Sequence, residues 1–98
     1  MNEISISDLL KINKEKIQII DIREPYEYLS GNLDCVNIPM GDILESRNKI
    51  KKNKKVIFYC QSGRRAASVV YMLKKQFGFD NIYNLNGGYK AYLDFKEK

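Results

Sequence analysis

The chain has 98 residues, of which 44% are hydrophobic and 30% are charged, and these proportions are ordinary for one globular domain. We therefore expect residues 1–98 to form a single domain, and no apolar run is long enough to cross a membrane. The first residues lack a basic-then-apolar signal pattern, so the sequence predicts a cytoplasmic protein without a membrane partner.

The formal net charge of +5 raises the question of nucleic-acid binding, because basic surfaces attract phosphate. Much of the excess positive charge comes from lysines within residues 49–55, a segment without aromatic side chains on which bases could stack. A solvated connecting segment explains this run, and we expect no nucleic-acid partner.

The apolar pattern predicts strands and helices that alternate along the chain. Strands are expected at residues 3–6 (an edge), 17–22, 36–38, 56–60 and 82–85, since these runs are short and mostly rich in β-branched or aromatic residues. Helices are expected after the N-cap Ser7, from Pro25 until Gly31, over residues 64–77 with Gly78 as the stop, and from near Gly88. In the long helix the apolar residues expected at helical spacing are Ala66, Ala67, Val70, Leu73 and Phe77. Such alternation indicates an α/β fold with a mainly parallel sheet and helices on both faces.

The chain contains two cysteines, Cys35 and Cys60, and no histidine. Without a C-x-x-C pair or a histidine, the sequence predicts no metal site, no thioredoxin-type redox pair and no cofactor. Any nucleophile must also be activated by a group other than imidazole.

Cys60 ends a buried strand and is followed by a short loop, Gln61-Ser62-Gly63-Arg64-Arg65, that leads into the long helix. In parallel sheets ligands bind beyond the carboxyl ends of the strands. Backbone N–H groups of the loop, the helix N-terminus and the two arginines all favour a thiolate over a thiol, and the thiolate is the nucleophile. A structural buried cysteine is the alternative, but it does not explain the glycine and two arginines that follow directly.

Five segments of the chain resemble the rhodanese family in order and spacing. They are Asp21-Ile22-Arg23-Glu24-Pro25-Tyr26-Glu27-Tyr28, Gly31-Asn32-Leu33, Asn37-Ile38-Pro39, Cys60-Gln61-Ser62-Gly63-Arg64-Arg65 and Asn84-Leu85-Asn86-Gly87-Gly88-Tyr89. The resemblance extends from about Ile4 to Tyr92. The chain departs from the family pattern at four positions. Asn32 stands where the family usually has histidine, and Cys35 where it usually has glycine. Ala66 stands where serine or threonine is common, and Tyr92 where tryptophan is common.

The resemblance implies a rhodanese-like, five-stranded parallel sheet flanked by helices, and a thiosulfate sulfurtransferase. Cys60 would take sulfane sulfur from thiosulfate or a persulfide and pass it to cyanide, a thiol or a protein acceptor, by ping-pong kinetics. Residues Gln61, Ser62, Gly63, Arg64 and Arg65 would bind the donor, with Arg65 closing the loop.

Asp21 and Arg23 end the other long strand and are candidates for supporting roles beside the cysteine loop. For Arg23 we favour an ion pair with Glu27, and for Asp21 hydrogen bonds from N–H groups of the cysteine loop. Cys35 enters a strand at the end opposite Cys60, too far for a disulfide, and is interpreted as a packing residue.

Two other functions remain open on the sequence. One is a sulfur carrier or interaction module with little turnover alone, for which residues 49–55 would be a docking surface. The other is a cysteine-dependent phosphatase or arsenate reductase, although those enzymes need one residue more than the four that separate Cys60 from Arg65.

Overall fold

In the computed structural model, which describes residues 2–97, five strands form one sheet in which every neighbouring pair is parallel. The order across the sheet is β1-β5-β4-β2-β3. Their bounds are β1 (Glu3–Ile4), β2 (Ile17–Asp21), β3 (Val36–Asn37), β4 (Lys55–Tyr59) and β5 (Ile82–Leu85). This confirms the predicted α/β fold.

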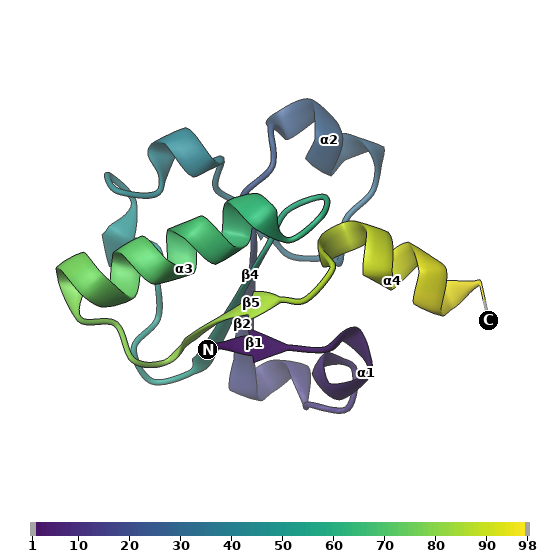
Figure 1. The fold of residues 1–98 in the computed structure, drawn as a ribbon, viewed down its shortest axis with the longest axis horizontal. Coiled ribbons are helices and arrows are strands. Elements are labelled where there is room, and N and C mark those ends of the chain that lie inside the picture. The colour runs from purple at the N-terminus through teal and green to yellow at the C-terminus, as the bar shows by residue number, and fades with distance from the viewer. Residues whose placement is uncertain (1, 98) are drawn as a thin grey trace.

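Four α-helices within residues 2–97 accompany the strands: α1 (Ile6–Leu9), α2 (Pro25–Ser30), α3 (Arg64–Phe77) and α4 (Gly88–Lys96). Helix α3 covers one face of the sheet, and α1 and α4 lie against the other (Figure 1). None of the helices described is both long and apolar enough to cross a membrane.

Helix α3 occupies the predicted residues because its apolar side chains recur at helical spacing. Ala66, Val69, Val70 and Leu73 are buried against the sheet. Ala67 and Phe77, which the pattern had placed with this face, are exposed. Gly78 ends the helix with a φ of 71°, in the left-handed region that favours glycine.

Several predicted boundaries were wrong by small shifts, and those at the ends of β2 and β4 matter for the site. Strand β2 ends at Asp21, and β4 runs one residue earlier than predicted, so Cys60 is the first residue after the strand. The N-cap of α1 is Ser5 rather than Ser7, since the Ser5 hydroxyl accepts the N–H of Asp8 at 3.1 Å.

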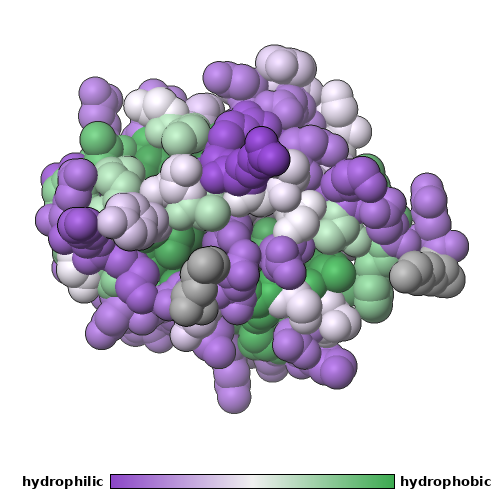
Figure 2. Space-filling model, viewed as in Figure 1, coloured by the Kyte–Doolittle hydropathy of each residue, from purple (hydrophilic) through white to green (hydrophobic). Residues whose placement is uncertain are grey.

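The surface in the view of Figure 2 is mostly hydrophilic, and apolar residues show between the polar ones. The lysine-rich residues 49–55 lead into β4 and are exposed, apart from the buried Ile50 and the half-buried Lys54. The segment is therefore the solvated connection that its composition predicts.

Candidate functional site

The side chain of Cys60 lies under the loop that joins β4 to α3, and the residue is fully buried. Its Sγ accepts the backbone N–H of Gly63 at 3.1 Å and that of Ala66 at 3.4 Å. The loop and the first turn of α3 therefore direct two N–H groups at the sulfur. The same groups can receive negative charge that forms on it.

The start of α4 holds the other side of this loop in place (Figure 1). The N–H of Tyr89 donates to the Cys60 carbonyl at 2.8 Å, and the N–H of Lys90 donates to the Gln61 carbonyl at 3.1 Å. Gly88 permits this approach, because a Cβ atom there would overlap with the Cys60 carbonyl oxygen. Gly63 has a φ of 100° and lets the chain turn into α3.

Arg65 is paired with Glu27 of α2, at 3.3 Å and 3.4 Å between guanidinium nitrogens and carboxylate oxygens. The hydrogen bond to Glu27, and to a smaller extent the neighbouring Cys60 side chain, raise the pKa of Arg65. Partial burial by itself raises the pKa of Glu27, but hydrogen bonds from Arg65 and the backbone N–H of Glu24 outweigh it and hold this pKa below 4.5. Gln61, Ser62 and Arg64 of the same loop are exposed.

The predicted pair of Arg23 with Glu27 was wrong: Arg23 binds Asp21. Its guanidinium donates to Asp21 at 2.8–3.1 Å, and its backbone N–H donates to the same carboxylate at 2.9 Å. Asp21 and Arg23 are both buried. The Asp21 carboxylate therefore pairs with the guanidinium beside it, and not with the loop N–H groups that we expected as its partners. Arg23 does reach the cysteine loop, because one nitrogen donates to Gln61 at 3.3 Å.

Arg23 also packs against two aromatic rings, one of which belongs to α4. Its guanidinium carbon lies 4.3 Å from the ring centroid of Tyr89 and 5.5 Å from that of Tyr59. A pocket of about 250 Å³ opens beside these side chains and the cysteine loop. It is lined by Arg23, Tyr26, Glu27, Ser30, Gly31, Gln61, Tyr89 and Leu93.

Cys35 packs on the face of the sheet opposite Cys60, in the cluster that contains Tyr59 and Leu33. Its Sγ lies 3.6 Å from the Tyr59 hydroxyl. Burial raises the pKa of Cys35 to about 11, so this thiol stays protonated near neutral pH. This placement agrees with its interpretation as a packing residue.

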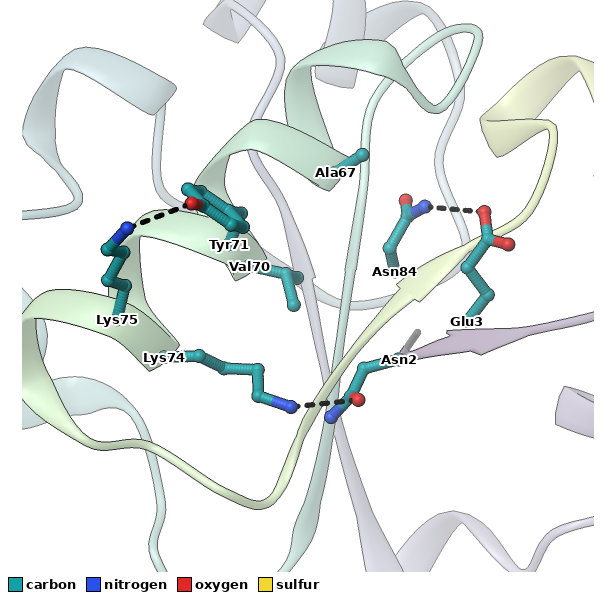
Figure 3. Close-up of a pocket in the computed structure, with 8 residues that line it drawn as sticks. All are labelled: Asn2, Glu3, Ala67, Val70, Tyr71, Lys74, Lys75 and Asn84. Atoms are coloured by element: carbon teal, nitrogen blue, oxygen red, sulfur yellow. Dashed lines mark hydrogen bonds between the residues drawn. The ribbon is translucent and has the colours of Figure 1, made fainter.

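A larger hollow of about 580 Å³ lies elsewhere, between α3 and the edge strand β1 (Figure 3). It is lined by Asn2, Glu3, Ala67, Val70, Tyr71, Lys74, Lys75 and Asn84, and none of these belongs to the cysteine loop. Within residues 2–97 no group of three or more metal-ligating side chains could hold a metal ion.

Sequence reasoning missed three features of the site: Glu27 as the partner of Arg65, Gly88 as the contact to the Cys60 carbonyl, and the Tyr59–Tyr89 packing. Glu27 and Arg65 are 38 residues apart in the chain, so no local pattern joins them. The paired glycines Gly87 and Gly88 were the one signal present, at the start of the expected last helix.

Residues 7–94 match the family model described as a rhodanese-like domain, and the chain belongs to this family. A sulfurtransferase of Allochromatium vinosum is 33% identical over 95 residues, which cover 94% of this chain and 88% of the relative. The uncharacterized protein YqhL of Bacillus subtilis is 40% identical over 78 residues, or 79% of this chain. Among solved structures, a rhodanese-related protein of Thermoplasma volcanium superposes with a TM-score of 0.86 at 29% identity, covering 97% of this chain and 93% of that one.

The relatives differ in length from this chain. It spans 61% of the Bacillus subtilis protein and 28% of a tRNA uridine(34) hydroxylase of Pelagibacter ubique, to which it is 35% identical over 86 residues. The family and the named relatives together support a sulfurtransferase-like protein.

Proposed function

We propose that this protein is a sulfurtransferase that carries sulfane sulfur on Cys60. The donor is thiosulfate or a persulfide, and the acceptor is cyanide, a thiol or a protein thiol. One observation carries the proposal: two backbone N–H groups converge on the Sγ of a cysteine placed directly after a central parallel strand.

The reaction proceeds in two displacements. The Cys60 thiolate attacks the sulfane sulfur of the donor, the donor's S–S bond breaks, and its electron pair leaves with sulfite or with a thiolate. The acceptor then attacks the outer sulfur of the Cys60 persulfide and releases the original thiolate. In this proposal the N–H groups of Gly63 and Ala66 hold the negative sulfur, and Gln61, Ser62, Arg64 and Arg65 surround the donor.

Burial favours a second candidate, a sulfur carrier that turns over slowly alone. Cys60 is fully buried, so a donor or acceptor reaches the sulfur only when the groups above it move aside. A protein acceptor that binds against the loop would supply that movement. Because either function needs Cys60 as a reduced thiol, we place it in a reducing compartment such as the cytoplasm.

The test is intact-mass analysis after incubation with thiosulfate and, separately, with a small alkyl persulfide. We expect one added sulfur that cyanide or a thiol removes, in the native protein and in Cys35→Ser, and no addition in Cys60→Ser. Steady-state turnover with cyanide separates the enzyme from the carrier, which loads once but does not cycle. An adduct that persists in Cys60→Ser would refute the proposal.

A further inference from the structure

Two arginines beside the cysteine loop, Arg23 and Arg65, are paired with carboxylates. Asp21 neutralises Arg23 at 2.8 Å, and Glu27 neutralises Arg65 at 3.3 Å. Arg64 is exposed, where water and salt weaken its field. These side chains therefore add little net positive charge with which to attract an anion.

This balance of charge bears on the choice of donor. A Cys60 thiolate carries one negative charge and thiosulfate carries two, so their approach is repulsive unless a free cation offsets it. An alkyl persulfide carries at most one negative charge, and its protonated form RSSH, which is the electrophile in the transfer, carries none and meets no such barrier. We propose that Glu27, by holding Arg65, makes the site select small alkyl persulfides over thiosulfate. This inference rests on the sulfurtransferase function proposed above.

The favoured step is balanced in atoms and charge. The Cys60 thiolate attacks the terminal sulfur of RSSH, a Cys60–sulfur bond forms, and the donor's S–S bond breaks. Its electron pair leaves as RS⁻, and the proton remains on the transferred sulfur, giving Cys60–S–SH. One negative charge enters and one leaves, and no oxidant or reductant is needed.

Glu27 is a positioning residue rather than a catalytic one, because its carboxylate contacts Arg65 and acts through it. Its carboxylate also accepts the backbone N–H of Glu24 at 3.0 Å, at the start of α2. Glutamine serves at this helix position as well as glutamate does. Glu27→Gln therefore removes the negative charge while the helix start keeps its hydrogen bond.

The experiment measures second-order rate constants for sulfur loading of Cys60 by intact mass, with thiosulfate and with hydroxyethyl persulfide generated in solution. The native protein should load from the persulfide about tenfold faster or more. Glu27→Gln should raise the thiosulfate constant about tenfold and change the persulfide constant by less than about threefold. Glu27→Asp keeps the charge and should keep the native preference. Salt should accelerate thiosulfate loading in the native protein and should do so less in Glu27→Gln.

Glu24→Gln is the matched control, since it removes an exposed carboxylate from the same helix start and should leave the preference unchanged. Equal use of both donors by the native protein, an equal change of both constants in Glu27→Gln, or an equal effect of Glu24→Gln would overturn the inference. Loading of neither donor would instead refute the sulfurtransferase function.

Discussion

Gly88 is the residue at which the last helix meets the cysteine loop. Its φ is 62°, and a Cβ atom would overlap with the backbone of Cys60 and Gln61, neither of which can rotate away. Gly88→Ala should lower the free energy of unfolding by about 2–4 kcal/mol, since left-handed backbone and forced contact both cost energy.

Urea denaturation measures this loss. Gly41→Ala is the control, because no atom lies within 4 Å of a Cβ built there, and it should change stability by less than about 0.5 kcal/mol. Equal stability of the two variants would show that the loop tolerates displacement by α4.

The reactivity of the Cys35 thiol should depend strongly on pH. Because burial raises its pKa to about 11, only roughly one part in 3,000 is thiolate at about pH 7.5. In Cys60→Ser, alkylation of the folded protein by iodoacetamide should be very slow at that pH and should rise about tenfold per unit until about pH 11.

The raised pKa belongs to the folded state, so the urea-unfolded variant should label rapidly near neutral pH. Mass spectrometry of the two samples provides the comparison. Rapid labelling of the folded variant at neutral pH would contradict the burial of this thiol on the far face of the sheet.

At the scale of elements, the buried pair Asp21–Arg23 joins three segments. Arg23 follows β2, one of its nitrogens donates to the Gly31 carbonyl at the end of α2, and another donates to Gln61 in the cysteine loop. Removing the carboxylate leaves a buried guanidinium without its counter-charge. Asp21→Asn should therefore cost about 3–5 kcal/mol of unfolding free energy.

The exposed pair Lys90–Asp94 is the control, at 3.2 Å and four residues apart on α4. Asp94→Asn should cost less than about 0.5 kcal/mol, because exposed pairs are screened by water and salt. Thermal or urea unfolding measures both. A loss below about 1 kcal/mol for Asp21→Asn would show that water reaches Arg23 and replaces its partner.

Elements were predictable from the sequence to within one or two residues at the long segments, because their evidence is local. Helix α3 and strand β5 have the predicted bounds. The ion pairs were not predictable: Arg23 was expected to pair with Glu27, but it pairs with Asp21, and Glu27 pairs with Arg65. Which partner a cation takes depends on how strand ends are placed in space, and spacing along one helix does not contain that information.

At the scale of the whole molecule, alternation of strands and helices predicted the parallel sheet but not its order. The two long apolar strands β2 and β4 lie side by side inside the sheet, as their apolar sequences favour. The position of Cys60 after a buried strand followed from the sequence. The closure of its loop by α4 did not, because it depends on backbone contacts between distant segments.

Strand β1 pairs with β5, so Glu3 lies beside Asn84 and Ile4 beside Leu85. Within this domain, β1 is therefore synthesised well before the strand that completes its place in the sheet. Contacts this distant in sequence slow folding, because a long loop must close before they form. During synthesis the central pair β2–β4 can assemble first, while β1 must wait for β5 and the cysteine loop must wait for the start of α4.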